Sequence, residues 1–420
     1  MTSTRTRTRL GAGYYRLWSA SALSNVGDGI FLVVLPLLAA ELTRSPVLVA
    51  GVALAQRLPW LFFALPAGAL ADRLDRRRTM ALVESMRVVV LGGLAVATAL
   101  DVASIPMLYV AALVLGIGET LFDTAAQSVI TAVVAKDDLV KANGRLYAVE
   151  MTANQFIGPP LGGFLAGVAT IGLTLGFGAS AVLFAGAAVL LTLLRGSFRP
   201  ERPEEAAGRS LWGDIVDGLR YLFGQRVLRT LAVMTGVQNL AFTAATSVLV
   251  LYAVGPDSPM GLSESTYGVL WAMIGVGAVV GSLVAAPIER WVGRTNVLTL
   301  SILTGTLFTA VPAVTAEFVP VAAAFALSSI GIIGWNVVTV SLRQRITPDH
   351  LLGRVNAGYR LLAWGSMPLG AAIGGLVAEA FGLRVVFAVG SVAVLALLAL
   401  RPVVSEANLR AAEGAPATAA

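Results

Sequence analysis

The stretch at residues 68–78 reads GALADRLDRRR; it begins at the end of an apolar run at residues 48–71 and is followed by a second run at 81–100. Each run is long enough to cross the hydrocarbon core of a bilayer, which takes about 20 mostly apolar residues. Arginine-rich loops next to such runs mark the cytoplasmic side of a membrane protein. The stretch therefore predicts two membrane-spanning helices that are joined by a short cytoplasmic loop.

The whole chain has the composition that such segments require. Its 420 residues are 57% hydrophobic and 13% charged, and the mean hydropathy is +0.81. A soluble domain carries about 25% charged residues, and a single soluble core stops growing near 250–300 residues. The composition therefore excludes a water-soluble enzyme, a disordered scaffold and a fibrous protein.

Apolar windows of spanning length recur along the chain and predict twelve spans, six in each half. The predicted spans are residues 17–40, 48–71, 81–100, 105–134, 145–169, 171–194, 228–254, 266–288, 296–315, 319–341, 354–378 and 383–400. Helices are expected because hydrocarbon cannot satisfy open backbone groups. The sequence thus predicts an all-α membrane protein with 12 transmembrane helices in two six-helix bundles.

One long polar segment divides the spans and defines the predicted domains. We expect an N-terminal bundle at residues 1–194, a cytoplasmic linker at 195–227, a C-terminal bundle at 228–400 and a cytoplasmic tail at 401–420. The proline-rich start of the linker cannot be a helix interior. The apolar residues after Ser210 recur at helical spacing and predict an amphipathic helix on the inner membrane surface.

The basic residues indicate topology. The formal net charge is +6, and most of the basic residues lie in the N-terminal arm, the linker, the tail and alternate loops. This distribution predicts that both termini are cytoplasmic. No aromatic-interleaved basic module suggests nucleic acid. The excess of arginine over lysine hints at a bacterial genome, so we expect a multi-pass protein of the bacterial inner membrane.

The sequence offers little material for cofactor or metal chemistry. It has no cysteine and one histidine, His350, which excludes thiolate metal sites, a histidine metal cluster and a serine–histidine relay. No Gly-Lys-Ser/Thr phosphate loop is present, so ATP is not expected as the energy source. We predict no metal, no cofactor and no enzymatic activity.

Residues 68–78 resemble the signature loop of the major facilitator superfamily, with a glycine, Leu-Ala-Asp-Arg and a basic run. Asp75 stands where the usual glycine follows the Asp-Arg pair, as in the drug- and siderophore-exporting branch. A degenerate copy lies at residues 286–294. The resemblance implies that these loops latch the two halves in one state and release them in another; the alternative is a simple topogenic loop. The implied latch residues are Gly68, Asp72, Arg73, Arg76, Arg77, Glu289 and Arg290.

The fifth span contains the sequence GPPLGG at residues 158–163, which is similar to the core of the family's antiporter motif. The motif's earlier glycines are missing, since Asn154 and Arg145 stand in their places. The resemblance implies export rather than import. Prolines free backbone carbonyls and bend a helix, and small residues admit a neighbouring helix; packing alone is the alternative. The predicted helix-bending residues are Gly158, Pro159, Gly162 and Gly163.

Four ionisable residues lie near the middle of the predicted spans: Asp28, Arg57, Glu119 and Asp123. A charge in lipid costs at least about 2.5–3.5 kcal/mol, so a retained one faces a cavity or a partner. We expect the three carboxylates to carry protons or a substrate cation, with Arg57 as their counter-ion. Alternatively, Arg57 only pairs with Asp28. The fourth span resembles a second family motif, but Ala112 replaces the arginine on which a proton relay would depend.

Two further acid and base residues, Glu84 and Arg87, are interpreted as a structural pair at the inner end of the third span. Arg360 is interpreted as a snorkelling residue, with a substrate role as the weaker alternative. Polar and aromatic groups at mid-span depth predict a cavity for a large amphipathic substrate, and packing is the alternative for the aromatics. The predicted cavity residues are Asn25, Gln56, Gln238, Asn239, Trp335, Asn336 and Trp364.

These patterns together predict a secondary active transporter, a monomer embedded in lipid. It would export an amphipathic small molecule, drug- or siderophore-like, in exchange for protons by alternating access. A proton-coupled importer or uniporter of a metabolite is the alternative within transport. A non-transporting membrane receptor and an intramembrane enzyme are the alternatives from other classes.

Overall fold

The structure is a computed structural model that describes residues 10–63, 74–135, 138–194, 198 and 211–414. Within these ranges the chain is almost entirely helical, and the only β-pairing is an isolated bridge between Val254 and Leu262. Backbone hydrogen bonds are thus satisfied inside each helix, as hydrocarbon requires.

In its described residues, the N-terminal half contains seven α-helices and a π-helical turn, Thr152–Ile157, in the fifth predicted span. The helices are α1 (Ala12–Leu42), α2 (Pro46–Phe62), α4 (Arg76–Ala99), α5 (Ile105–Val133), α6 (Leu139–Met151), α7 (Gly158–Ala166) and α8 (Gly172–Thr192). The fifth span is therefore a composite of α6, the π-helical turn and α7, and it is not one regular α-helix.

The C-terminal half adds six long helices and two amphipathic ones. The long helices are α10 (Arg226–Ala253), α11 (Glu264–Val292), α12 (Arg294–Val314), α13 (Phe318–Ile346), α14 (Asp349–Phe381) and α15 (Leu383–Ala396), followed by a 3-10 turn at Leu397–Leu400. The amphipathic helices are α9 (Leu211–Gly224) before α10 and α16 (Glu406–Gly414) near the C-terminus.

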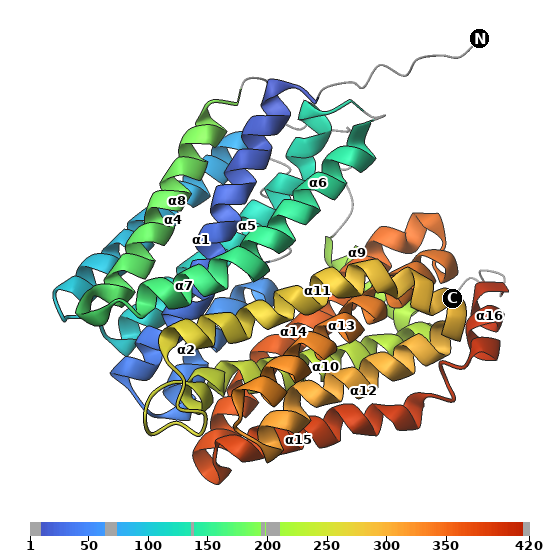
Figure 1. The fold of residues 1–420 in the computed structure, drawn as a ribbon. Coiled ribbons are helices and arrows are strands. Elements are labelled where there is room, and N and C mark those ends of the chain that lie inside the picture. The colour runs from blue at the N-terminus through green and yellow to red at the C-terminus, as the bar shows by residue number, and fades with distance from the viewer. Residues whose placement is uncertain (1–9, 64–73, 136–137, 195–197, 199–210, 415–420) are drawn as a thin grey trace.

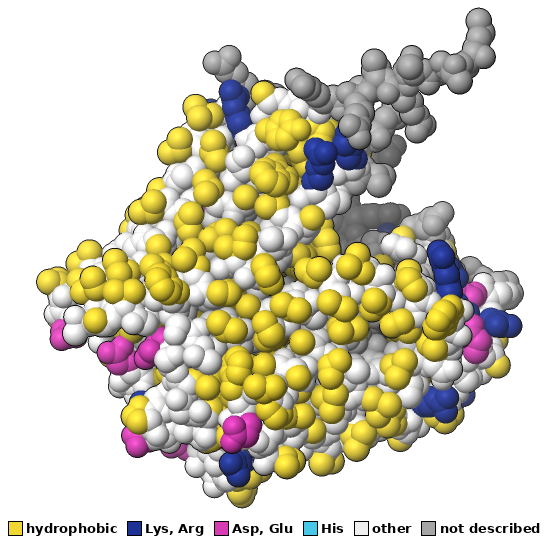
Figure 2. Space-filling view, viewed as in Figure 1, with side chains coloured by type: hydrophobic (Ala, Val, Ile, Leu, Met, Phe, Trp, Pro, Cys, Tyr) yellow, Lys and Arg dark blue, Asp and Glu magenta, His cyan; other side chains and the backbone are white. Residues whose placement is uncertain are grey.

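In the described residues, ten helices are long and apolar enough to cross a membrane. The shorter apolar α2 and the composite of α6 and α7 occupy the second and fifth predicted spans. The fold is thus all-α, with twelve spanning segments in two bundles (Figure 1). On the face shown in Figure 2, apolar side chains cover both bundles, and most basic side chains lie at the ends near the two termini.

Several helices run beyond the predicted windows. The structure extends α13 to Ile346 and starts α14 at Asp349, whereas the apolar windows end at 341 and begin at 354. A hydropathy window detects only the part of a helix that matches the hydrocarbon core, whereas backbone hydrogen bonding continues the helix into the headgroup region. The polar ends of these helices therefore line the mouth of the space between the bundles.

The two bundles meet at one end and diverge at the other (Figure 1). At the closed end, Ser45 Oγ donates a hydrogen bond to Glu379 Oε2 over 3.0 Å. A Cβ atom on Gly163 of α7 would lie 2.8 Å from the Cα of Gly268 on α11. The open end is the one where α1 begins and where α9 and α16 lie.

The predicted amphipathic helix of the linker is α9. It was expected to lie on the inner membrane surface, and the structure shows that it also packs against α13 and α14. Leu222 is fully buried, and the Tyr221 hydroxyl donates to the Ile346 carbonyl over 3.0 Å. Arg354 of α14 lies 3.3 Å from Asp217. The segment is thus fixed to the start of α14. Most of the linker before α9 lies outside the described residues, so the domain boundaries at 194 and 227 stay a prediction.

Candidate functional site

The space between the bundles contains three adjoining chambers. The largest, about 570 Å³, lies between α2 and α5 of one bundle and α13 and α14 of the other. Chambers of about 410 Å³ and 260 Å³ lie beside it. Trp364 lines the first and second chambers, and Gln155 lines the second and third. The shared walls make them parts of one inter-bundle cavity.

Most of the predicted cavity residues line this space. The second chamber is lined by Gln238, Asn239, Trp335, Asn336 and Trp364, and the third by Gln56. Asn25 lines none of the three, and its side-chain amide donates to the Ser21 carbonyl of its own helix over 2.8 Å. From the sequence alone, a polar group that lines the cavity could not be told from one that turns back onto its own helix, as Asn25 does.

Two of the lining residues also hold the C-terminal bundle together. The Trp335 indole donates to Thr235 Oγ1 over 2.9 Å, which joins α13 to α10. The Asn239 side-chain amide donates to the Ala363 carbonyl over 2.7 Å, which joins α10 to α14. These side chains are satisfied by protein partners, so they form the rigid wall of the cavity.

An aromatic pair bridges the two bundles at the boundary of the chambers. The rings of Trp60 on α2 and Trp364 on α14 meet edge to face with centroids 4.8 Å apart. Such pairs contribute about 0.5–1.5 kcal/mol beyond the area they bury. The sequence analysis did not select Trp60. It lies in an apolar run near a predicted cytoplasmic loop, and this position does not distinguish a cavity residue from a packing residue.

A buried charge cluster lies inside the N-terminal bundle. Arg87 of α4 lies 3.4 Å from Asp28 of α1 and 3.6 Å from Glu84, one turn away on α4. Ser24 Oγ donates to Glu84 Oε1 over 2.9 Å. Glu84 is 0% exposed and Arg87 3%, whereas Asp28 keeps 31% of its side chain exposed. The cluster is thus sealed on one side and open at Asp28.

This geometry corrects two expectations about the charged residues. The described counter-ion of Asp28 is Arg87 rather than Arg57, and Glu84 with Arg87 belongs to the central cluster rather than to the inner end of the bundle. Arg57 instead lines the third chamber beside Asn154. The depth of a residue along a span can be counted from the sequence, but the helices that pack around it cannot be predicted in this way. In the structure α4 packs so that Arg87 reaches Asp28 of α1.

The remaining predicted acids are only partly placed. Glu119 of α5 is half-buried. The side chain of Asp123 lies outside the described part of the structure. The Arg87 guanidinium also lies over the rings of Phe122 and Phe184, with its Cζ 5.4 Å and 5.0 Å from their centroids. These aromatic faces stabilise a cation in an otherwise apolar interior.

The predicted helix-bending residues lie where α7 contacts both bundles. A Cβ on Gly158 would lie 2.5 Å from the Cα of Gly29 on α1, and one on Gly162 would lie 2.8 Å from the Ile30 carbonyl oxygen. Gly163 faces α11 on the other side. Only glycine allows backbones to approach this closely. Pro159 follows the π-helical turn, and its missing N–H removes a hydrogen bond from that turn.

The predicted latch is described only in part, because Gly68, Asp72 and Arg73 lie outside the described residues. Asp75 accepts a hydrogen bond from the Arg78 backbone N–H over 3.0 Å and thereby caps α4. Arg77 Nη1 donates to the Leu194 carbonyl over 2.6 Å, and the Arg76 backbone N–H donates to the Phe198 carbonyl over 3.3 Å. These two arginines hold the start of α4 to the segment after α8.

The second copy of the loop anchors the C-terminal tail through a residue that the sequence analysis did not select. Glu289 is half-buried and Arg290 is exposed. Arg294, at the start of α12, lies 2.8 Å from Glu406 and 2.5 Å from Glu413 of α16. The hydrogen bond from Arg294 holds the pKa of Glu406 below its usual value. An arginine network therefore fixes α16 at the open end.

The profile of the transmembrane secretion effector family matches residues 10–418. The multidrug efflux pump Tap of Mycolicibacterium fortuitum is 28% identical over 396 residues, which is 90% of this chain and 92% of Tap. The enterobactin exporter EntS of Salmonella choleraesuis (strain SC-B67) is 29% identical over 295 residues, 69% of this chain and 67% of EntS.

Among solved structures, a bacterial homologue of the iron transporter ferroportin in its inward-facing state has the same fold. The TM-score is 0.73 at 16% identity, over 97% of this chain and all of that one. Because the family profile spans nearly the whole length, the chain belongs to the transmembrane secretion effector family of the major facilitator superfamily, and it is a multi-pass membrane transporter rather than an enzyme.

Proposed function

We propose that this transporter exports an amphipathic small molecule from the bacterial cytoplasm in exchange for protons, by alternating access. The observation that carries the proposal is the Asp28–Arg87–Glu84 cluster, buried in one bundle of a protein whose bundles open at one end. The relatives named as a multidrug efflux pump and an enterobactin exporter support the direction of transport.

The sidedness of the proposal follows from charge. The helix α1 begins at the open end, where α9 and α16 also lie, and the sequence before α1, before α9 and around α16 is rich in arginine. Basic segments favour the cytoplasm. The described conformation is then inward-facing, with the inter-bundle cavity open to molecules in the cytoplasm. Both termini are cytoplasmic in this arrangement.

Proton coupling is supported by the charge balance of the cluster. Two carboxylates contact one arginine among the described groups, and the side chain of Asp28 is partly exposed whereas Glu84 and Arg87 are buried. Burying an uncompensated charge is costly, so a proton that joins the cluster removes an unfavourable charge. A proton on Asp28 weakens its attraction to Arg87 and leaves the arginine to Glu84.

A mechanical route connects the cluster to the second bundle. Asp28 is followed by Gly29, whose backbone is packed against Gly158 of α7. The same helix α7 contacts α11 of the other bundle through Gly163 and Gly268. Asp28 is therefore adjacent in sequence to the glycine that contacts α7, and α7 contacts both bundles. A change in charge at Asp28 can act on α7 through this contact.

The test is transport by the purified chain in proteoliposomes with an imposed pH gradient and a fluorescent amphipathic probe. We expect uphill probe movement out of the compartment that the termini face, coupled to proton movement in the opposite direction. Flux toward the termini would instead favour an importer, and gradient-independent equilibration would favour a uniporter.

The matched variants are Asp28→Asn and Asp257→Asn, since Asp257 is an exposed residue of the closed-end loop. Asp28→Asn should abolish gradient-driven accumulation and keep probe binding, whereas Asp257→Asn should behave as the unmodified protein. Full accumulation by Asp28→Asn would contradict proton coupling through the cluster.

A further inference from the structure

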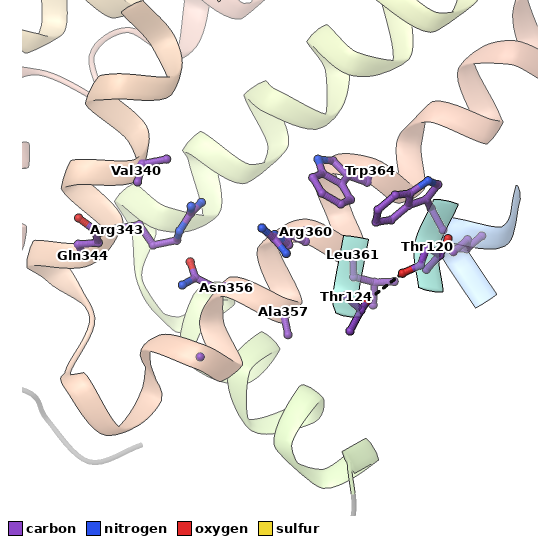
Figure 3. A pocket seen from close by; sticks show the side chains of 13 residues that line it. Thr120, Thr124, Val340, Arg343, Gln344, Asn356, Ala357, Arg360, Leu361 and Trp364 are labelled. Atoms are coloured by element: carbon purple, nitrogen blue, oxygen red, sulfur yellow. Dashed lines mark hydrogen bonds between the residues drawn. The ribbon is translucent and has the colours of Figure 1, made fainter. Parts of the chain in front are cut away.

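We propose that the largest chamber selects substrates that carry an anionic oxygen group on an apolar or aromatic body. This inference rests on the proposed function and names the substrate class of the same cavity. The geometry behind it is a pair of arginines, Arg343 of α13 and Arg360 of α14, that point toward one another across the chamber (Figure 3).

The two guanidinium groups are positioned but not neutralised. Arg343 lies over the Tyr359 ring with its Cζ 4.1 Å from the centroid, and Arg360 lies over the Trp364 ring at 5.0 Å. Cation–π contacts fix a guanidinium and leave its charge in place. No carboxylate stands among the described residues that line this chamber.

The guanidinium group of Arg343 also has hydrogen-bond donors that the described residues do not satisfy. Nε and Nη1 of Arg343 are buried and have no hydrogen-bond partner in the described structure. An arginine that only snorkels to the membrane surface would keep these donors in water. Guanidinium donors match a carboxylate or similar oxyanion in a two-pronged arrangement, which is the strong form of such contacts.

Neighbouring arginines at the same end behave differently. Arg354 has Asp217 as a partner, and Arg294 has Glu406 and Glu413. The chain thus supplies acidic partners for structural arginines in this region. The described structure shows no acidic partner for Arg343 or for the exposed Arg360. A ligand that reaches the chamber would supply one, and it would also accept from the buried donors of Arg343.

The other walls of the chamber suit an apolar body. Trp60, Leu61, Leu361 and Trp364 contribute apolar surface, and Thr120 uses its hydroxyl to hydrogen-bond the Gly116 carbonyl of its own helix over 2.9 Å. The volume of about 570 Å³ is in the range of small-molecule sites. The anionic end would meet the arginines of the C-terminal bundle, and the apolar body would lie against the tryptophans between the bundles.

The experiment compares three fluorescent naphthalene probes that share one body and carry a carboxylate, a carboxamide or an alkylammonium group. Equilibrium binding and pH-gradient-driven flux are measured on the full chain in proteoliposomes. The carboxylate probe should bind about tenfold or more tightly than the carboxamide, as charge-assisted hydrogen bonds predict. Equal binding of the carboxylate and carboxamide probes would overturn the inference.

The variants are Arg343→Gln and Arg360→Gln, with Arg343→Lys to keep the charge and Arg226→Gln as a control at an exposed arginine of the same end. The glutamine variants should lose the preference for the carboxylate probe and bind the carboxamide probe as before. Arg343→Lys should retain part of the preference, and Arg226→Gln all of it. Loss of the preference in Arg226→Gln to the same extent would show a general surface potential and overturn the inference.

Failure of this inference can be told from failure of the proposed function. Uphill flux of all three probes without preference would leave proton-coupled export intact and remove the anion site. Arginine-dependent binding of the carboxylate probe without uphill flux would keep the anion site and remove the proposed export.

Discussion

The two bundles arrange their charged side chains in opposite ways. In the N-terminal bundle, Arg87 is surrounded by Asp28, Glu84 and two aromatic rings, so cation and anions lie together. In the C-terminal bundle, Arg343 and Arg360 face a cavity with aromatic support and no described carboxylate. Under the two proposals made above, this difference would be a division of roles, in which one bundle binds protons and the other binds the charged group of the substrate.

The difference between the bundles is tested most directly by replacing Arg87 in one bundle and Arg343 in the other. Arg87→Met leaves two buried carboxylates without their cation, and losing one partner of a buried pair costs about 3–5 kcal/mol. We expect a large fall in the midpoint of thermal unfolding in detergent, partly restored by adding Glu84→Gln. Arg343→Met should lower the midpoint far less. Equal losses would mean that both arginines are structural.

The link between the bundles is tested by enlarging Gly163. A Cβ at this position would meet the Glu264 carbonyl oxygen at 2.6 Å, so Gly163→Val should force α7 away from α11. We expect transport to fall about tenfold, as small displacements of positioned elements can cause, whereas Gly178→Ala, which has open space, should transport normally. Normal flux in Gly163→Val would show that the α7–α11 contact is not needed for cycling.

The roles of charge and apolar surface are separated by Trp364→Ala. The variant removes aromatic surface from two chambers and one support of Arg360. Binding of the carboxylate and carboxamide probes should weaken together by about two- to tenfold. A loss confined to the carboxylate probe would mean that the ring only positions the arginine.

The smallest expected effect concerns the tail and pH. Because the pKa of Glu406 is lowered in the folded protein, its contact with Arg294 is fully present above the ordinary glutamate value, about 4.3, and is lost as the pH falls through the lowered value. With no native cysteine, a fluorophore at Ala411→Cys reports on α16 alone. Its anisotropy should stay constant at neutral pH and fall below about pH 4. Glu406→Gln should remove the acid step, and an unchanged step would assign it to another group.

The sequence predicted more of the fold than of the geometry of the candidate site. Apolar windows of spanning length predicted the spanning segments seen in the described residues, because the bilayer imposes one length and one backbone solution on all of them. Pairings between helices were not predictable in this way. Arg57 and Arg87 both lie in spans, and only the packing of α4 against its neighbours shows that Arg87 is the partner of Asp28.

Side chains at helix ends were the second limit. The predicted span ended at residue 341 and so left Arg343 outside it, whereas α13 continues to Ile346 and carries Arg343 into the cavity wall. Asp75 was noted only as a departure from a family pattern, and its function as the cap of α4 required the backbone geometry. Hydropathy predicts how deep a residue lies in the membrane, but it does not predict toward which neighbour its side chain points.

The π-helical turn at Thr152–Ile157 has a consequence for how the molecule can move. Pro159 and Pro160 cannot donate to the carbonyls one turn earlier, so α6 and α7 are joined by a wide turn with fewer backbone constraints. We expect the fifth span to bend at this turn, so that α6 can tilt at the open end while α7 keeps its glycine contacts with α1 of its own bundle. A tilt of this kind would narrow the open end without repacking α7 within the N-terminal bundle.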